Sequence, residues 1–400
     1  MRKWNNVKSP ERRISSSSIE ESIFLDSLSG PERDYVKNLK RKDRSDLGKI
    51  VVSKKKLPVV PLRVKVLQSH LPEPLKNKLF SDLSQSVSDK NMQWILKAIK
   101  IPLKVFHPPP PFGLRKAREY MDEVIVGHEM AKKEILKVVQ QCILNPEAEP
   151  AAYSIGLEGP PGSGKTQFVK QAVAKALNRP IISLPVGGVT DGNTLLWGHN
   201  YTYEGSKEGR LVGGMIEHEC CNPIVYIDEI DKISSGTHSD LSASLLHLID
   251  PSANTKLRDR YFHDIDIDFS KCVFIFSYND ASQVNPILLN RIKRIPFPRP
   301  STTDMYKILK TIIIPRVQKR IKSNATFTND AIDMIIEEGN ATDNGMRELE
   351  RIVDHVLTDL ELENALREVD VTTITKKEVE KCRKHVCSEK AKSIPLGMYM

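Results

Sequence analysis

The sequence predicts an α/β protein: a core built on a parallel sheet, a helical domain after it and a small helical segment before it. Three observations support this prediction. A glycine-rich loop at 159–166 stands between an apolar strand and a helix. Short continuous apolar runs alternate with helical patterns, which is typical of parallel strands covered on both faces. From about Ser301 onward, helical patterns replace the strands.

Residues 1–66 are expected to form a basic, mostly disordered tail, because they mix Ser, Lys and Arg with little periodicity. Residues 1–70 hold 17 Lys and Arg against 8 Asp and Glu, and the resulting +9 equals the formal charge of the whole chain. Such a region attracts nucleic acid or another acidic surface. A merely solvated tail accounts for the composition equally well.

A helical segment is predicted over 67–106. Within it, "PEPLKNKLFSDLSQ" and "SDKNMQWILKAIK" carry apolar residues at helical spacing, and Ser88 and Asp89 are placed to cap the second helix. Four prolines from Pro108 to Pro111 then force an extended backbone, so a stiff linker is predicted over 107–116.

The α/β nucleotide-binding domain is predicted over 117–300. Its expected strands lie in "YSIGLE", "PIISL", "PIVYID" and "CVFIFS". The helix after the first strand carries an apolar face formed by Phe168, Val169, Ala172, Val173, Ala176 and Leu177. A helical lid domain, with caps at Ser301 and Asn329, is expected over 301–387, and a tail over 388–400.

The glycine-rich loop matches G-x-x-x-x-G-K-[ST] in its required context between a strand and a helix. Its members are Gly159, Pro160, Pro161, Gly162, Ser163, Gly164, Lys165 and Thr166. Backbone amides and the helix N-terminus face a phosphate, Lys165 reaches the terminal phosphates, and Thr166 offers a hydroxyl to Mg²⁺. The pattern therefore predicts ATP and Mg²⁺ as ligands.

Two further strands end in polar residues. "PIVYIDEIDKI" places Asp228 and Glu229 at the carboxyl edge of the sheet, where the phosphates are expected. Asp228 is predicted to join the Mg²⁺ shell, and Glu229 to polarise a water for attack on the γ-phosphate. "CVFIFSYND" brings Asn279 to the same edge, where it suits positioning of that water; a turn-forming Asn is the alternative.

Taken together, these motifs resemble the AAA+ ATPase module of Lon protease, from about residue 70 to 387. The segments that carry the resemblance, in order, are "GPPGSGKT", "VGGVTDGNTLLWGHNYTYEGSKEGRLV", "VYIDEIDKI", "SLLHLIDPSAN", "IFSYNDASQVNPILLNRI" and "GMRELER". The resemblance implies a five-stranded α/β domain with a helical lid, assembled as a homo-oligomeric and usually hexameric ring with ATP sites at subunit interfaces. It implies sensor roles for Asn279 and Arg347. It also implies that Arg291 is the arginine finger, the side chain that reaches the γ-phosphate bound by the neighbouring subunit, with Arg294 as the alternative.

In Lon, an aromatic residue followed by an aliphatic residue and glycine forms the loop that grips polypeptide in the central pore. Here the corresponding residues are Tyr203, Glu204 and Gly205, so the aromatic residue is kept and a carboxylate replaces the aliphatic one. The resemblance implies a substrate pore loop at Tyr203 and Glu204. Without the resemblance, an aromatic residue before a glycine in a polar loop indicates a hairpin turn more often than a pore loop.

The sequence departs from Lon at its end, because Lon continues into a protease domain with a Ser-Lys dyad and this chain stops 13 residues after Cys387. Ser252 of "DPSAN" lies in an ATPase element and is rejected as a nucleophile. The expected activity is therefore ATP-driven unfolding or remodelling of a protein substrate without proteolysis. Two alternatives stay open: a nucleic-acid-associated loader or motor using residues 1–70, and a structural ring ATPase.

The sequence has no run of about 18 apolar residues, so no membrane association is expected. Its six cysteines show no disulfide framework, which favours a reducing compartment, cytoplasmic or nuclear. A mitochondrial address is less favoured because acidic residues interrupt the Arg- and Ser-rich start. Cys382, His385 and Cys387 are interpreted as a helix end, because no second ligand pair accompanies them.

Overall fold

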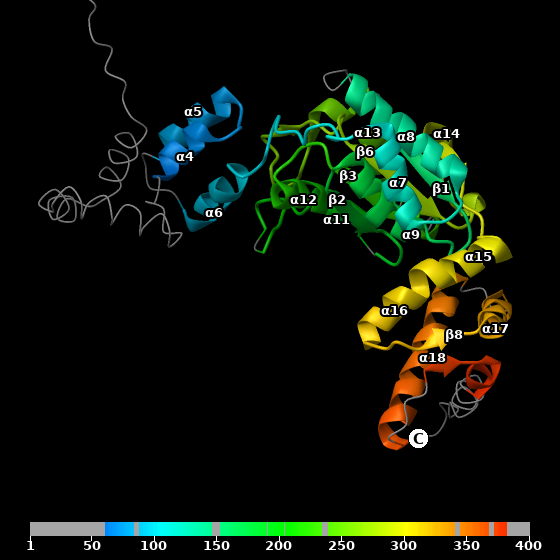
Figure 1. The fold of residues 1–400 in the computed structure, drawn as a ribbon. Helices are drawn as coiled ribbons and strands as arrows, with labels where there is room; N and C mark the ends of the chain where they lie inside the picture. Colours follow the sequence, from blue (N-terminus) through cyan, green and yellow to red (C-terminus); the bar gives the residue numbers. More distant parts are fainter. Residues whose placement is uncertain are drawn as a thin grey trace, which may run out of the picture. The chain divides into compact units, whose positions relative to one another are not determined.

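The computed structural model describes residues 61–83, 88–145, 153–189, 191–203, 205–233, 239–340, 345–367 and 372–381. The chain divides into two units, Met1–Ile101 and Pro102–Met400. Figure 1 shows the elements in sequence order by colour. The basic tail before residue 61 and the cluster of Cys382, His385 and Cys387 lie outside the described residues.

The first unit contributes three helices, α4 (Leu62–Gln68), α5 (Glu73–Asp82) and α6 (Asp89–Ala98). Helix α4 begins before residue 67, where the helical segment was expected to start. Ser88 caps α6 as predicted, because its side chain accepts a hydrogen bond from the Asn91 amide. The apolar faces of these helices are buried, including Leu75, Leu79 and Trp94.

The second unit contains a five-stranded parallel sheet in the order β2-β3-β6-β1-β7. Its strands are β1 (Tyr153–Glu158), β2 (Ile181–Pro185), β3 (Ile224–Asp228), β6 (Val273–Tyr278) and β7 (Lys293–Pro296). Four of these strands, and the five-stranded α/β architecture, confirm the sequence prediction. Strand β7 was not predicted from the sequence, because only one of its four residues is buried and it has no continuous apolar run.

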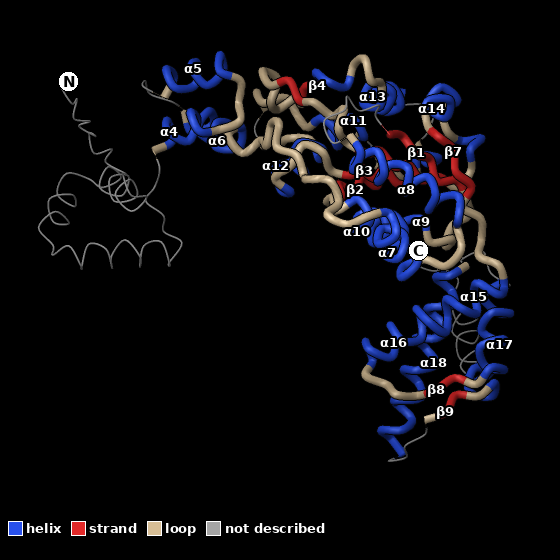
Figure 2. Tube along the Cα trace, turned by 45° about the horizontal axis from the view of Figure 1, so that its top comes forward, coloured by secondary structure: helices blue, strands red, loops and turns tan. Residues whose placement is uncertain are grey.

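Helices α7 (Leu114–Val124) and α8 (Glu129–Leu144) share one apolar core with the helix that follows the glycine-rich loop. That helix runs through α9 (Lys165–Gln167), a π-helical stretch (Phe168–Val173) and α10 (Ala174–Leu177). All six apolar residues predicted for its inner face are fully buried. Figure 2 shows these helices beside the strands of the sheet.

The remaining elements of the core connect the strands. They are α11 (Gly192–Trp197), α12 (Arg210–His218), a 3₁₀ turn (Ile230–Lys232), α13 (Ser239–Ile249), a 3₁₀ turn (Asn254–Lys256), β4 (Leu257–Arg258), β5 (Asp266–Ile267), a 3₁₀ turn (Ala281–Gln283) and α14 (Pro286–Arg291). Strands β4 and β5 pair as a short antiparallel hairpin.

The extended segment before α7 is fastened to the core. The side chain of Asn222 accepts a hydrogen bond from the His107 amide at 2.7 Å and donates to the His107 carbonyl at 3.0 Å. The Cys221 amide donates to the Val105 carbonyl at 2.8 Å. These contacts hold the chain beside the start of β3, just before the prolines.

The C-terminal helices form a second core of their own. They are α15 (Thr302–Ile308), a π-helical stretch (Leu309–Ile313), α16 (Ile314–Ile321), α17 (Asn329–Asn340) and α18 (Met346–Arg367), with a two-stranded pair of β8 (Thr326–Phe327) and β9 (Thr373–Ile374). Ser301 caps α15 as predicted. The predicted cap at Asn329 is wrong: Asn329 is the first helical residue, and the Thr328 hydroxyl accepts from the Ala331 amide at 3.4 Å.

No helix in the described part of the chain combines the length and the apolar character needed to cross a membrane.

Candidate nucleotide site

A cavity of about 390 Å³ lies where the glycine-rich loop, the carboxyl ends of β3 and β6, and the lid helices α16 and α18 approach one another. Parallel strands in one sheet expose their carboxyl ends at one edge, so loops far apart in sequence meet there. Most of the predicted site residues line this cavity: Pro161, Gly162, Ser163, Gly164, Lys165, Thr166, Asp228, Glu229, Asn279 and Arg347.

The glycine-rich loop has a backbone that side chains would disrupt. Gly162 and Gly164 adopt φ angles of +72° and +99°, which glycine alone adopts without strain. A Cβ on Gly159 would lie 2.0 Å from the Phe297 carbonyl oxygen. The Ser163 hydroxyl is buried and has no hydrogen-bond partner among the described residues. A donor without an acceptor, in a loop that faces the helix N-terminus, fits a phosphate ligand.

Lys165 is held inside this loop. Its Nζ donates to the carbonyl oxygens of Gly159 at 2.6 Å and Pro160 at 2.9 Å, and to Oδ1 of Asn279 at 3.0 Å. Burial lowers the pKa of Lys165 to about 8, and the nearby carboxylate of Asp228 opposes that shift. The ammonium therefore stays largely charged at neutral pH and faces the cavity as a cation.

The two predicted metal ligands converge. The Thr166 Oγ1 lies 3.3 Å from Oδ2 of Asp228 and 3.2 Å from the Tyr226 hydroxyl. Tyr226 donates to the Ser277 Oγ at 3.0 Å, and Ser277 donates to Oδ1 of Asp228. A hydroxyl and a carboxylate are the hard oxygen ligands that Mg²⁺ prefers, so this pair fits the metal.

Tyr226 and Ser277 are supporting residues that sequence reasoning missed. Burial raises the pKa of Tyr226 above its ordinary value, so its hydroxyl stays protonated and donates. Both residues belong to continuous apolar strands, β3 and β6, where they look like core positions. The signal that could have identified Tyr226 and Ser277 is a hydroxyl group in an otherwise apolar strand.

Glu229 occupies a strained position directly after β3. Its φ angle is +62°, in the left-handed region that non-glycine residues rarely adopt. Such outliers gather at functional sites, where the surrounding structure enforces them. The carboxylate lies against Gly187, since a Cβ added to that glycine would be 2.3 Å from the Glu229 Oε2. Gly187 follows β2 and leaves the space that this carboxylate fills.

Asn279 is placed by Asp231, a third residue that the sequence analysis did not single out. The buried Asp231 accepts hydrogen bonds on Oδ2 from the backbone amides of Asn279 at 3.0 Å and Asp280 at 3.3 Å. This carboxylate links the turn after β3 to the end of β6. It thereby fixes the position from which the Asn279 side chain reaches Lys165.

The lid closes one side of the cavity. The Met346 amide, at the start of α18, donates to the Gly162 carbonyl at 3.1 Å, and Arg347 follows it on the cavity wall. Arg316 of α16 and Glu350 of α18 also line the cavity and form an ion pair at 2.7 Å. Cationic side chains from the lid and from the loop therefore face one space, as a polyphosphate requires.

An apolar end of the cavity lies between α7, α8 and the lid. It is lined by Val124, Ile125, Val126, His128, Ile308, Ile312 and Ile313. His128 stacks on Phe297 with ring centroids 3.7 Å apart. Burial lowers the pKa of His128 to about 4, and the charge of Lys132 adds to that shift, so the ring is neutral at pH 7. An apolar space beside a charged one suits a nucleotide base.

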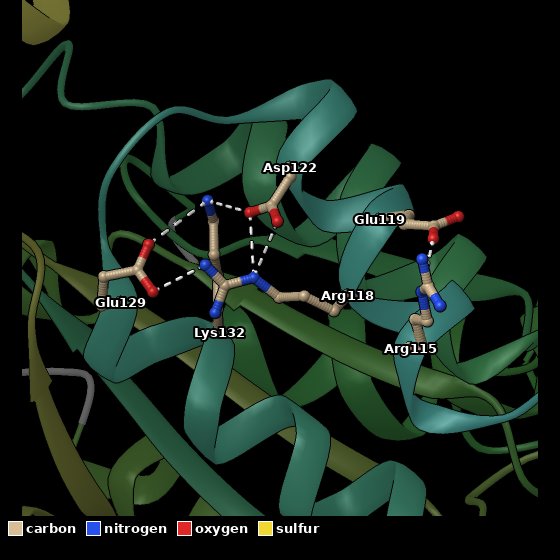
Figure 3. Close-up of polar contacts among 6 residues, drawn as sticks. All are labelled: Arg115, Arg118, Glu119, Asp122, Glu129 and Lys132. Atoms are coloured by element: carbon tan, nitrogen blue, oxygen red, sulfur yellow. Dashed lines mark hydrogen bonds and ion pairs between the residues drawn. The ribbon is translucent and has the colours of Figure 1, made fainter.

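An ion network fixes the corner between α7 and α8, which carries this apolar wall. Figure 3 shows Arg118 and Lys132 lying between Asp122 and Glu129. Arg118 contacts Asp122 at 2.8 Å and Glu129 at 2.6 Å, and the buried Lys132 contacts Asp122 at 2.6 Å. Burial opposes ionisation of Asp122, but the bonds from Arg118 and Lys132 leave its pKa below the ordinary value.

Residues 155–299 match the family described as "ATPase family associated with various cellular activities (AAA)". The chain is 29% identical over 373 residues to a Lon protease homolog of Acanthamoeba polyphaga mimivirus, covering 87% of this chain and 35% of that protein. It is 34% identical over 244 residues to the Lon protease of Campylobacter jejuni subsp. jejuni, covering 60% and 29%.

A third relative is the peroxisomal Lon protease homolog 2 of Oryza sativa subsp. indica, 34% identical over 240 residues, covering 60% of this chain and 27% of that protein. The chain thus spans about a third or less of the length of these relatives. It carries a Lon-like AAA+ module. The resemblance predicted from the motifs is therefore confirmed.

Within the Lon-like module, Arg291 does not line the cavity of its own chain. It ends α14, and its Nη1 donates to Oδ2 of Asp250 at 2.6 Å. The rival Arg294 lies on β7 and pairs with Glu158 at 2.8 Å. Both arginines are thus engaged by carboxylates of their own chain, on different elements.

The loop before α12 carries Tyr203, away from the cavity. The Tyr203 side chain is 67% exposed, and its amide donates to the Asn200 carbonyl at 3.2 Å. The predicted partner Glu204 lies outside the described residues. The far end of this loop is anchored, because the Gly209 amide donates to Oδ2 of the buried Asp259 at 2.8 Å.

Proposed function

We propose that this protein is an ATP-hydrolysing AAA+ ATPase that works as a homo-oligomeric, hexameric ring and unfolds or remodels protein substrates without cutting them. One observation carries the ATPase part: the phosphate loop, the Thr166–Asp228 pair, Glu229 and Arg347 border one cavity. These residues come from the core and the lid, and together they supply the parts that phosphoryl transfer needs.

ATP binds with its phosphates against the loop amides and Lys165, and with its base at the apolar end beside His128. Thr166 and Asp228 hold Mg²⁺, which neutralises charge on the phosphate oxygens when bound. Arg347 contacts the phosphates from the lid. Because Lys165 donates to loop carbonyls and Asn279, nucleotide binding requires exchange of some of those bonds for bonds to phosphate.

Hydrolysis needs a polarised water in line with the γ-phosphate. Glu229 accepts the proton of that water, and its strained backbone and the adjacent Gly187 direct its carboxylate. Asn279 orients the water. Arg291 of a neighbouring copy meets the charge that develops on the transferred group, an effect worth about 10³ to 10⁵ in rate.

Two substitutions test the chemistry. Lys165→Ala removes the cation that faces the terminal phosphates, so nucleotide binding should be lost. Glu229→Gln keeps the shape of the site and should bind ATP normally while hydrolysis falls to background. Binding is measured with a fluorescent ATP analogue and turnover by phosphate release. Normal hydrolysis by Glu229→Gln would contradict the role of Glu229 in polarising the attacking water.

Assembly is tested by concentration. If Arg291 acts on the nucleotide of a neighbour, the ATPase rate per subunit should rise with protein concentration, and Arg291→Ala should bind ATP but hydrolyse it poorly. Sedimentation in parallel gives the oligomeric state. A rate that does not depend on concentration in a monomeric sample contradicts the ring mechanism.

The substrate is a polypeptide gripped by Tyr203. An exposed aromatic side chain on a loop anchored at its far end can contact an extended chain without regard to its sequence. Glu204 beside it favours basic segments. Tyr203→Ala should keep ATPase activity and lose unfolding of a tagged fluorescent protein, and the wild type should leave that protein at full length. Unfolding that survives the substitution, or specific fragments that accumulate, contradicts the proposal.

A second candidate function is a nucleic-acid-associated ATPase, a loader or motor, and the charge of residues 1–70 favours it. This function predicts salt-dependent binding of DNA or RNA that is lost on deletion of 1–70. Nucleic-acid binding that is unchanged by deletion of residues 1–70 contradicts this second function.

A reducing compartment, cytoplasmic or nuclear, fits the free thiols of Cys142, Cys220, Cys221 and Cys272. The matched relatives include peroxisomal and mitochondrial Lon proteases, so imaging of the tagged full chain against markers for all four compartments is the test.

A further inference from the structure

The Asp250 carboxylate, which pairs with Arg291, accepts hydrogen bonds on both of its oxygens. It follows directly after α13, and its Oδ1 accepts from the Ser252 amide at 3.0 Å and the Ser252 Oγ at 2.7 Å. Its Oδ2 accepts from the Arg291 Nη1 at 2.6 Å. Each oxygen has a separate task, because one is fixed by its own turn and the other receives the guanidinium.

The carboxylate stays charged over the working pH range. Hydrogen bonds from Ser252, and then from Arg291, lower the pKa of Asp250 to about 2. The pair therefore does not depend on small changes in pH.

Arg291 itself projects from a short, well-anchored helix. Asn285 caps α14 through the Ile287 amide, and Pro286 starts it. The Arg291 side chain is 46% exposed although it is paired, and Asp250 takes only one of its five N–H donors. Ile287, one turn earlier, is 58% exposed. The guanidinium is thus half exposed and, among the described residues, keeps N–H donors for a second acceptor.

We propose that Asp250 is a positioning residue that directs the Arg291 guanidinium outward, toward the nucleotide of a neighbouring copy. This inference rests on the proposed role of Arg291 in the ring. A free arginine side chain samples many rotamers, and ordering one costs about 2- to 10-fold in an equilibrium constant. Asp250 meets that cost before the subunits engage, so the finger is preorganised.

The opposite effect, sequestration, predicts the opposite sign. If Asp250 kept Arg291 from its target, its removal would raise the ATPase rate. The geometry favours positioning, because the bond occupies one N–H group and leaves the side chain half exposed. An ion pair at this level of exposure contributes little to folding stability, so its loss should leave the fold intact.

The chain offers a matched control. Arg258 and Asp266 form a similar exposed pair on the β4–β5 hairpin, with Nε and Oδ1 2.6 Å apart and side chains 62% and 44% exposed. The pair lies outside the cavity lining and outside α14. Asp266→Ala thus removes an equivalent surface ion pair without touching Arg291.

In the full-length protein at ring-forming concentration, Asp250→Ala should lower kcat for ATP hydrolysis by about 2- to 10-fold, with KM for ATP nearly unchanged. Asp250→Asn, which keeps an acceptor, should fall between it and the wild type. The double variant Asp250→Ala with Arg291→Ala should be no slower than Arg291→Ala alone, because the effect passes through Arg291. Asp266→Ala should match the wild type. A rate that rises, or additive losses, overturns the proposal.

Mixed rings separate this inference from the function it rests on. Lys165→Ala subunits cannot use ATP but can donate a finger, so adding them to Arg291→Ala subunits should restore hydrolysis. Donors that also carry Asp250→Ala should restore about 2- to 10-fold less. Equal restoration by both donors overturns the role of Asp250 and leaves the finger standing. No restoration by the Lys165→Ala donor overturns the trans finger itself, and the Asp250 proposal with it.

Discussion

The space beside Glu229 offers a direct test of how its carboxylate is directed. In Gly187→Ala, the new Cβ would lie 2.3 Å from the Glu229 Oε2 and 3.2 Å from the Glu229 Cβ. The first distance is too short for any real contact, so the carboxylate must move by about 1 Å to reach ordinary van der Waals separation. The atom that moves is the far end of a flexible side chain, so the fold yields easily.

A displacement of about 1 Å in a catalytic group costs on the order of 10²-fold in rate, which corresponds to about 2.7 kcal/mol in the activation barrier. Gly187 is not in the left-handed region, so alanine fits its backbone. The free energy of unfolding should therefore stay the same or rise by up to about 1 kcal/mol, because alanine restricts the unfolded chain. We expect kcat to fall about 10²-fold while nucleotide affinity and stability persist.

Gly188→Ala is the control, with the opposite profile. Gly188 has open space around it but a φ of +77°, so alanine strains the backbone by about 1–2 kcal/mol and contacts nothing. This variant should lose stability in urea unfolding and keep kcat within about twofold. The assay is phosphate release at saturating ATP, with a fluorescent nucleotide for affinity. Normal kcat in Gly187→Ala, or a loss confined to nucleotide binding, would refute the reasoning.

Three further outcomes are expected. Gly159→Ala should lower the free energy of unfolding by about 1–3 kcal/mol and abolish binding of the fluorescent nucleotide, because its Cβ would lie 2.0 Å from the backbone oxygen of Phe297, which cannot move aside cheaply. Burial raises the pKa of Asp259 to about 6, against the amides that hydrogen-bond it, so the folded state binds a proton more tightly than the unfolded state. The stability that this proton contributes is present at low pH and is lost as the pH rises through about 6. The difference in unfolding free energy between the wild type and Asp259→Asn, measured in urea, should thus favour the wild type more at pH 5 than at pH 7, by about 1 kcal/mol; a difference of the opposite sign contradicts the shift. Lys132→Met removes a charge that lowers the pKa of His128, so the His128 pKa should rise from about 4. It should stay below 6.5, because burial is the main cause of the lowered pKa and remains in the variant. An unchanged His128 pKa in an NMR titration would exclude the coupling.

Much of this architecture is local in origin and could be read from the chain. The strands β1, β2, β3 and β6 are continuous apolar runs, and the glycine-rich loop needs residue types that few other structures demand. Ser88 and Ser301 cap helices through bonds to amides only three residues away, so a short window contains the whole interaction. The predicted cap at Asn329 was wrong by one position, because the helix already includes Asn329 and the Thr328 hydroxyl accepts from the Ala331 amide.

The tertiary structure decided the rest, because those features depend on residues that are distant in sequence. Strand β7 has little apolar character and exists because β1 offers an edge to pair with. The Ser277 bond to Asp228 joins positions 49 residues apart, and the Asp250–Arg291 pair joins positions 41 apart. No local pattern encodes such a partner: it is set by strand order and by which loops meet at the carboxyl edge of the sheet. The sequence by itself determined the strands of the core and the glycine-rich loop, and packing alone determined that Gly187, Asp231 and Asp250 lie against Glu229, Asn279 and Arg291.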